Sequence, residues 1–147
     1  MTAPVFVDSN VFVYRHDTAD PEKQSKAEAW LTHLWRTRRG RLSTQVLQEF
    51  YINVTKKLKP GLSHQAAREE IRDLITWGPV SVDAEVIEAA WTIQDRFGLS
   101  FWDALIVAAA QACGCGYLLT EDLQHGQDLD GIRVTNPFLE DPGILAS

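Results

Sequence analysis

Two kinds of hydrophobic pattern alternate along this chain. Short unbroken runs, such as Val5–Val7 and Tyr117–Leu119, are typical of parallel strands that are buried on both faces. Between them lie longer segments in which hydrophobic residues recur every three or four positions, as in amphipathic helices. The alternation of the two patterns predicts the α/β class with a mostly parallel sheet.

The expected elements follow from where each pattern starts and stops. Strands are predicted over residues 5–7, 42–44, 80–82, 117–120 and 132–134. Helices are predicted from residue 21 to about 36, from about 46 to 58, and after the capping residues Ser63, Asp83 and Ser100. The last helix includes residues 104–110, which are hydrophobic all round and are therefore expected to be buried. At 147 residues the chain fits a single domain, with its core expected over about residues 5–138.

Charge is distributed unevenly along the chain, whose net charge is −6. Residues 1–59 hold ten Lys or Arg and six Asp or Glu, a net +4, whereas residues 60–147 hold four Arg and 14 Asp or Glu, a net −10. An acidic total argues against a nucleic-acid partner, but this asymmetry permits local binding of phosphates. Solvated helix faces explain the same distribution equally well.

Nothing in the composition indicates a membrane or secreted protein. No hydrophobic run reaches 18 residues, and the N-terminus lacks a basic stretch followed by a hydrophobic signal core. We therefore expect a cytoplasmic protein. Cys113 and Cys115 are the only cysteines, and without a nearby pair of histidines they are expected to be reduced structural residues rather than zinc ligands.

Four acidic residues share a structural context. Asp8 and Asp122 follow hydrophobic strand runs, Glu49 follows another predicted strand, and Asp103 heads the buried helix. The carboxyl ends of parallel strands meet at one edge of a sheet, so all four can reach the same point. Two unit charges about 4 Å apart repel by roughly 4 kcal/mol at an effective dielectric near 20, so such a cluster needs protons or a cation. Oxygen ligands without His or Cys favour Mg²⁺ or Mn²⁺, which activate water and stabilise phosphoryl charge.

Three of these acids also have a purely structural explanation. Asp8 is a suitable N-cap for the segment that follows it, and Asp103 stands where the acid of a Ser-x-x-Asp capping box lies. Glu49 is expected off the hydrophobic stripe, in the first turn of its helix, where it would stabilise the helix dipole. Taken alone, each residue leaves both explanations open. An acid at the head of a buried helix must, however, face a partner or a polar cleft, because an unpaired buried charge is costly.

Four segments together resemble the ordered motifs of the PIN-domain nucleases. They are VDSNV at residues 7–11, QVLQEF at 45–50, FWDALIVAAA at 101–110 and LLTEDL at 118–123. Each motif is weak alone, but four in this order and spacing are specific, and the likeness extends from residue 5 to about 138. In length the chain is similar to the single-domain VapC-type toxins of bacterial toxin–antitoxin pairs.

The resemblance implies a fold and an activity. The implied fold is a three-layer α/β/α domain with a five-stranded, mostly parallel sheet in the order 3-2-1-4-5. The implied activity is that of a Mg²⁺- or Mn²⁺-dependent endoribonuclease. In this sequence Asp8, Asp103 and Asp122 would hold the metal directly or through water, and Glu49 would complete the acidic cluster and help to position the attacking water. Asn10 and Thr120 match polar positions that the family often places beside the metal.

The resemblance also implies partners, namely an RNA substrate, a second copy of the chain in a homodimer, and a cognate antitoxin that blocks the cleft. Candidates for contact with the RNA backbone are Arg36, Arg38, Arg39, Lys56 and Lys57. Aromatic residues could line the partner surfaces, although packing in the core explains each of them as well. These are Trp30, Trp35, Trp77, Trp91 and Trp102.

Two other functions are compatible with part of this sequence pattern. Aspartyl-phosphate phosphatases and receiver domains also place an Asp after their first strand, but they depend on a late lysine, and no lysine follows Lys59. The phosphatases also need an Asp where this chain has Asn10, and an amide cannot act as a general acid. The second alternative is a catalytically inactive PIN domain that binds RNA or protein. The presence of all four acids argues against it but does not prove turnover.

Overall fold

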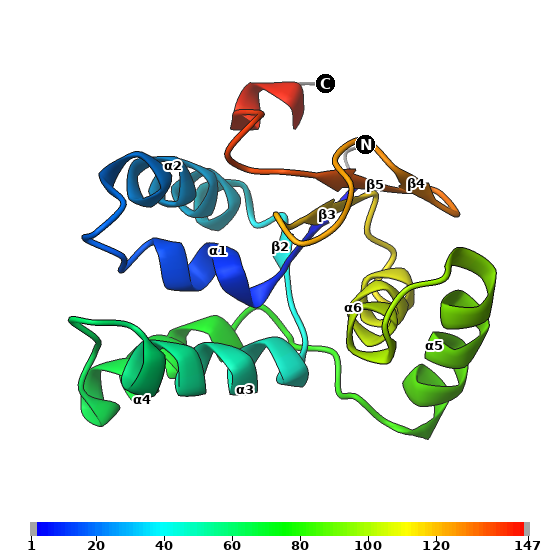
Figure 1. Ribbon diagram of the computed structural model, residues 1–147, viewed down its shortest axis with the longest axis horizontal. Coiled ribbons are helices and arrows are strands. Elements are labelled where there is room, and N and C mark those ends of the chain that lie inside the picture. Colours follow the sequence, from blue (N-terminus) through cyan, green and yellow to red (C-terminus); the bar gives the residue numbers. More distant parts are fainter. Residues whose placement is uncertain (1–2, 146–147) are drawn as a thin grey trace.

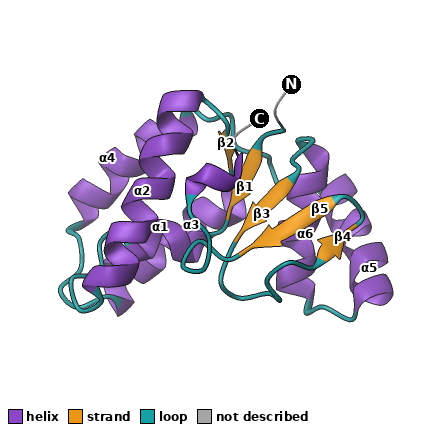
Figure 2. Cartoon of the chain, turned by 90° about the horizontal axis from the view of Figure 1, so that it is seen from above, coloured by secondary structure: helices purple, strands orange, loops and turns teal. Residues whose placement is uncertain are grey.

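A buried, mostly parallel sheet forms the centre of the molecule (Figures 1 and 2). The computed structural model describes residues 3–145, in which five strands lie in the order β2-β1-β3-β5-β4. They are β1 (Val5–Val7), β2 (Gly40–Arg41), β3 (Tyr117–Leu119), β4 (Asp128–Leu129) and β5 (Ile132–Thr135). β1 pairs in parallel with β2 and β3, and β3 with β5, whereas β4 is antiparallel to β5. The predicted α/β class is confirmed.

Helices cover the sheet. The described part of the chain forms α1 (Ser9–Tyr14), α2 (Pro21–Thr37), α3 (Thr44–Ile52), α4 (His64–Ile75), α5 (Ala84–Phe97) and α6 (Phe101–Ala112). Figures 1 and 2 place α1 to α4 together at one side of the molecule and α5 beside α6 at the other. All three residues of β1 are fully buried. Because alternate residues of a strand face opposite sides, both faces of the sheet are covered, as in a three-layer domain.

Most helices begin where the sequence predicts, because a side chain caps each of them. Asp20, Ser63, Asp83 and Ser100 each accept a hydrogen bond from the backbone N–H three residues further on. Pro21 occupies the first position of α2, where a missing N–H costs nothing. These caps place Asp103 in the first turn of α6, with its backbone N–H bonded to the hydroxyl of Ser100 at 3.1 Å.

The helix predicted over residues 46–58 is two elements. α3 begins at Thr44, with Ser43 as its N-cap, and after Ile52 the chain continues as the π-helical turn η1 (Asn53–Lys57). Glu49 is therefore the sixth residue of α3, and its predicted place in the first turn is wrong. Because the effect of the helix dipole falls off within the first turn, it does not account for this glutamate.

The strand bounds differ from the prediction in detail. Residues 42–44 are not a strand, because Ser43 caps α3 and β2 ends at Arg41. Residues 80–82 contribute one parallel bridge, between Ser43 and Val80, before the chain turns into α5. That bridge adjoins the end of β2, so the predicted neighbours are kept, and the additional strand β4 extends the far edge. A tight turn at Asp130 and Gly131, both with positive φ (54° and 96°), connects β4 to β5.

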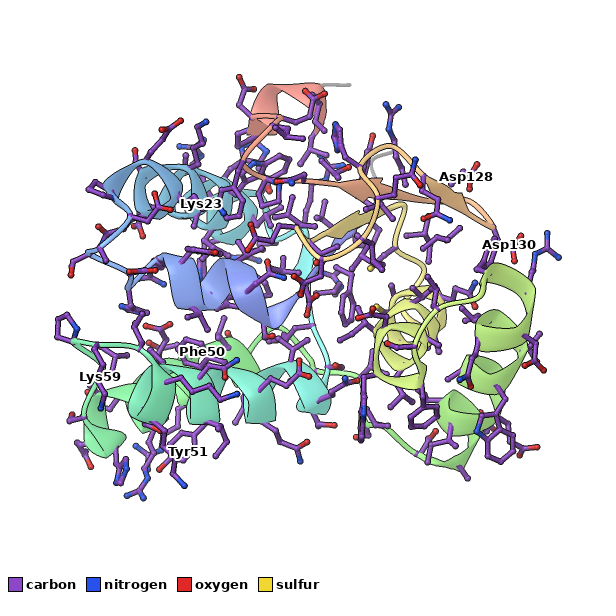
Figure 3. The ribbon with its side chains drawn as sticks, in the orientation of Figure 1. Lys23, Phe50, Tyr51, Lys59, Asp128 and Asp130 are labelled. Carbon is purple, nitrogen blue, oxygen red and sulfur yellow. The ribbon has the colours of Figure 1, made fainter. Side chains whose placement is uncertain are left out.

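Three charged residues mark the two ends of the molecule. Lys59 lies at one end of the molecule and Asp128 and Asp130 at the other (Figure 3).

Cys113 and Cys115 are free thiols whose sulfur atoms lie 3.3 Å apart. Within residues 3–145, no helix is long and hydrophobic enough to cross a membrane.

Candidate active site

The four acidic residues singled out in the sequence line one cleft of about 460 Å³. Asp8 directly follows β1, and its backbone N–H donates to the carbonyl of Leu119 at the end of β3 (3.0 Å). This pairing brings the segment after β3, which carries Asp122, beside Asp8. Glu49 comes from α3 and Asp103 from the first turn of α6. Four separate elements thus bring their carboxylates to the carboxyl edge of the sheet.

Asp8 is both a helix cap and a cleft residue. One of its oxygens accepts a hydrogen bond from the backbone N–H of Ser9 (2.7 Å), the first residue of α1. The other accepts from the hydroxyl of Thr120 (2.9 Å) and from the side-chain amide of Asn10 (3.4 Å). Only 6 % of Asp8 is exposed. The two explanations that the sequence left open are therefore compatible, because capping uses one face of the carboxylate and leaves the residue on the cleft wall.

Burial makes the negative charge of Asp8 costly. Desolvation raises the pKa of its carboxyl from 3.8 to about 7. The hydrogen bonds from Thr120 and Ser9 oppose this rise in pKa, whereas the neighbouring charges of Glu49 and Asp122 add to it. The site thus holds its innermost carboxylate in an environment that favours a proton or a cation beside it.

Asp103 is perturbed in the same direction. Burial is the main cause that raises the pKa of its carboxyl, a hydrogen bond between this carboxyl and the Ser100 side chain lowers it, and the charge of Asp122 raises it. The capping-box explanation from the sequence is correct for the backbone of Asp103. It does not account for the carboxylate, which faces the cleft and the charge of Asp122.

Asn10 and Thr120 connect the carboxylates of Asp8 and Asp122. The amide nitrogen of Asn10 donates to Oγ1 of Thr120 and to Oδ2 of Asp122, both at 3.1 Å. The hydroxyl of Thr120 accepts a further bond from the backbone N–H of Asp122 (3.1 Å). Thr120 is fully buried. The two residues therefore fix the separation of two acids that would otherwise repel each other.

Glu49 is oriented by residues that the sequence did not single out. Its Oε1 accepts from the hydroxyl of Ser9 (3.1 Å) and its Oε2 from the side-chain amide of Gln45 (3.4 Å). Gln45 also donates to the carbonyl of Trp102 at 3.4 Å, which links α3 to α6 across the cleft. The spacing of Gln45 and Glu49 by four helical positions was a usable signal, because such residues are neighbours on a helix surface.

The donor set suits a hard divalent cation in its chemistry. The cleft offers carboxylate oxygens and no His or Cys, and the buried Oδ1 of Asn10 has no hydrogen-bond partner among the described residues. In their present positions, no three His, Cys, Asp or Glu side chains within residues 3–145 form a group that could hold a metal ion. Direct ligation by three of the acids therefore requires their side chains to rotate, and ligation through water requires a smaller rotation.

The predicted RNA-binding residues do not all lie at this cleft. Lys57, on η1, lines it, whereas Lys56 beside it is exposed and is not part of the cleft wall. Arg36 and Arg38 lie at the end of α2, just before β2, and so at the opposite, amino edge of the sheet. Arg39 lies there too, and its guanidinium donates to the backbone carbonyls at residues 3 and 145. The three arginines therefore lie at the other edge of the sheet from the acids, and their contact with RNA stays a prediction.

A known protein family matches most of the chain. The family model of the PIN domain matches residues 5–127 of the chain. A comparison with curated protein sequences gave no match. Similar folds occur among solved structures at low sequence identity, so these show the fold alone.

Three such structures illustrate the likeness. A toxin–antitoxin complex from Klebsiella pneumoniae matches with a TM-score of 0.64 and 18% identity, covering 90% of this chain and 97% of that one. The sarcin–ricin loop cleaving toxin VapC20 of Mycobacterium tuberculosis matches with a TM-score of 0.58 and 21% identity, covering 78% and 86%. The promoter-DNA-bound VapBC2 complex of Rickettsia felis matches with a TM-score of 0.60 and 14% identity, covering 90% and 97%.

Proposed function

The chain belongs to the PIN domain family, and from this premise we propose that it is an endoribonuclease that hydrolyses RNA phosphodiester bonds with Mg²⁺ or Mn²⁺. The observation that carries the proposal is the convergence of four carboxylates, from four elements, on one cleft. In the proposed site Asp8, Asp103 and Asp122 would hold the cation directly or through water. A divalent cation there would lower the pKa of a water molecule and neutralise charge on a phosphoryl oxygen.

Glu49 is the residue proposed to position the attacking water. Its two oxygens each accept one hydrogen bond, from Ser9 and from Gln45, which fixes the plane of the carboxylate. A carboxylate has about four acceptor sites, so two remain available for a water molecule in the cleft. In the reaction the water oxygen forms a bond to phosphorus while the bond to a sugar oxygen breaks. The proton lost by the water passes to a carboxylate or solvent, and the departing sugar oxygen takes one up.

The charge balance of the site favours an enzyme over an inactive binding module. A surface that only binds RNA would be expected to present cations to the phosphates. This cleft instead keeps Asp8 almost fully buried beside the charges of Glu49 and Asp122, at a cost that raises its pKa to about 7. The phosphatase alternative has no support here, because the amide of Asn10 donates to Asp8 and Asp122 where that mechanism needs an acid.

A role as the toxin of a toxin–antitoxin pair is part of the proposal. It is supported by the family and by folds shared with a toxin–antitoxin complex and with VapBC2. On this proposal the partners are an RNA substrate, a cognate antitoxin that covers the cleft and a second copy of the chain, and the protein acts in the cytoplasm.

The proposal is tested by incubating the purified protein with structured RNA and Mg²⁺. We expect cleavage that stops when EDTA is added and that the Asp8→Asn variant lacks. Asp95→Asn, which changes an exposed acid on α5, serves as the matched control and should cleave like the wild type. Cleavage that survives EDTA or the Asp8→Asn substitution would contradict the metal mechanism. Absence of cleavage with any RNA would favour the inactive binding module.

A further inference from the structure

Cys113 and Cys115 lie in the short connection that leads from α6 into β3 (Figure 1). This connection precedes β3, so it lies at the opposite edge of the sheet from the acidic cleft. The two residues are the only cysteines of the chain, and their thiols form a hydrogen bond with 3.3 Å between the sulfur atoms. Packing accounts for the burial of Cys115 but not for the direct approach of the two thiols.

Both the backbone and the side chains hold this pair together. The backbone N–H groups of Cys113 and Cys115 donate to the carbonyls of Ala109 (3.3 Å) and Ala110 (3.0 Å), which ties both residues to the last turn of α6. Gly114 between them has a φ of 69°, the left-handed conformation that closes a helix end. The sulfur of Cys113 is itself held, because its thiol lies 3.3 Å from the carbonyl oxygen of Ala109 as well as 3.3 Å from the second sulfur.

The two thiols differ in their access to solvent. Cys115 is buried, with 7% exposed, whereas Cys113 is half-buried and Gly114 is exposed. The hydrogen bond from Cys115 lowers the pKa of the Cys113 thiol against the effect of burial, and the charge of Arg41 on β2 adds to this lowering. The hydrogen bond with Cys113 and burial raise the pKa of Cys115. A reagent from solution therefore meets Cys113 first, with Cys115 directly behind it.

A metal site explains the pair less well. Structural zinc needs four ligands, and within residues 3–145 no three His, Cys, Asp or Glu side chains form a group that could hold a metal ion. The charge that acts on both thiols is the cation of Arg41, which favours a thiolate and opposes a second cation. The arrangement instead favours a reaction that joins the two sulfur atoms, for which only a small further approach is needed.

We propose that Cys113 and Cys115 form a reversible thiol–disulfide exchange site that is oxidised by low-molecular-weight disulfides such as glutathione disulfide. The thiolate of Cys113 attacks one sulfur of the reagent, whose S–S bond breaks, and the released thiolate takes up the proton lost by Cys113. Cys115 then gives up its proton and attacks the sulfur of Cys113, and the second thiol leaves with that proton. Two protein S–H bonds and one external S–S bond thus become one internal S–S bond and two external thiols. This site is independent of the proposed ribonuclease activity, because its residues lie at the other edge of the sheet.

The test measures the exchange equilibrium of the full chain in mixtures of reduced and oxidised glutathione, both folded and unfolded in urea. The reaction is quenched with acid, the free thiols are alkylated, and intact mass spectrometry counts them. We expect chains with either both thiols alkylated or neither. The equilibrium constant for the internal disulfide should be at least about tenfold larger in the folded chain, which corresponds to about 30 mV. The fold has already fixed the backbone of Gly114, and fixing one residue costs the unfolded chain about this factor.

Two variants separate the steps of the exchange. Cys115→Ala should stop at a mixed disulfide with one glutathione. Cys113→Ala should react at least about tenfold more slowly than the wild type, because only the buried thiol remains. Thermal melts establish that both variants fold, and Cys115→Ser, which keeps the size of the buried group, replaces Cys115→Ala if that variant melts early.

The stability of the oxidised chain is a second readout. A tenfold preference of the folded state for the disulfide is also a tenfold stabilisation of the fold by the disulfide, so the oxidised chain should melt about 4 °C above the reduced chain. A lower Tm after oxidation would show that the fold opposes the disulfide and would overturn the proposal.

Three other results would also overturn it. Equal exchange constants in the folded and the unfolded chain would show that the fold does not prepare the pair. A wild type that takes up two glutathiones, or none, would show that the thiols do not exchange with each other. Disulfide-linked dimers on a non-reducing gel would make the cysteines a contact between two copies of the chain. Each of these results leaves the ribonuclease proposal standing, because RNA cleavage by the reduced protein tests that proposal separately.

Discussion

Asparagine in place of Asp8 should stabilise the metal-free protein at alkaline pH, although it removes a proposed catalytic group. The folded-state pKa of Asp8 is about 7, above its unfolded value of 3.8, so the folded protein binds this proton more tightly than the unfolded chain. The stabilisation that comes from binding this proton is therefore fully present below pH 3.8 and is lost as the pH rises to about 7. The shift of about 3 pKa units corresponds to a penalty of about 4 kcal/mol at pH 8.

The substitution relieves this penalty at the cost of hydrogen bonds. An asparagine oxygen can still accept from the N–H of Ser9, but its amide nitrogen cannot accept from Thr120 or Asn10. We expect a net gain of about 1–3 kcal/mol at pH 8, which raises Tm by about 3–9 °C for a chain of this size. The gain should shrink by about 2.5 kcal/mol between pH 8 and pH 5, because Asp8 of the wild type is already protonated there when folded.

Thermal and urea unfolding in EDTA at the two pH values measure this difference. Because the lost hydrogen bonds contribute at both pH values, the change in the gain with pH isolates the titration of Asp8. Asp95→Asn is again the control and should move the free energy of unfolding by less than about 0.5 kcal/mol at either pH. If Asp8→Asn gives the same change in stability at pH 5 and pH 8, the carboxyl does not carry the buried charge described above, and the electrostatic account of the site is refuted.

Three further changes are informative. Asp103→Asn should abolish RNA cleavage and leave the stability of the metal-free protein unchanged or slightly raised, since the hydrogen bond from the backbone N–H to Ser100 remains. A large loss of stability in urea unfolding would mean that capping is the main role of Asp103. Mg²⁺ at about 100 times its Kd should stabilise the wild type by about 2.7 kcal/mol in thermal melts, and Asp122→Asn should reduce this gain. An equal gain in the wild type and the variant would show that the ion binds outside the acidic cleft. Arg39→Ala should lower the free energy of unfolding in urea by about 1–3 kcal/mol, because two backbone carbonyls lose the hydrogen bonds from its guanidinium. It should leave the affinity for RNA unchanged. A large loss of affinity would show instead that Arg39 contacts the RNA.

Features that depend on local sequence were predicted well. The apolar run at residues 5–7 and the helix caps Asp20, Ser63, Asp83 and Ser100 each act through neighbours within a few residues, so composition and spacing indicated them. The edge strand β4 was missed, although the Asp130-Gly131 pair is a strong hairpin signal. The hydrophobic pattern around it is only two residues long, so periodicity could not reveal the strand.

The candidate site shows where sequence reasoning stops. Parallel strands place Asp8 and Asp122 at one edge for reasons that the sequence contains, whereas the orientation of each carboxylate depends on contacts between distant segments. Ser9 reaches Glu49 and Gln45 reaches Trp102 only once α1, α3 and α6 have packed together. The sequence also could not indicate on which edge of the sheet Arg36, Arg38 and Arg39 lie; the fold places them at the amino edge, and their contact with RNA stays a prediction.

Hydrolysis by an attacking water is the central claim, and it is tested most directly by cleaving RNA in ¹⁸O-labelled water with Mg²⁺ and reading the new ends by mass spectrometry. We expect each cut to leave one ¹⁸O atom on a terminal phosphate and a free hydroxyl on the other fragment, with no product formed by Asp103→Asn. A 2′,3′-cyclic phosphate without ¹⁸O would show that the ribose 2′-hydroxyl attacks instead, and it would contradict the role assigned to the acidic cleft.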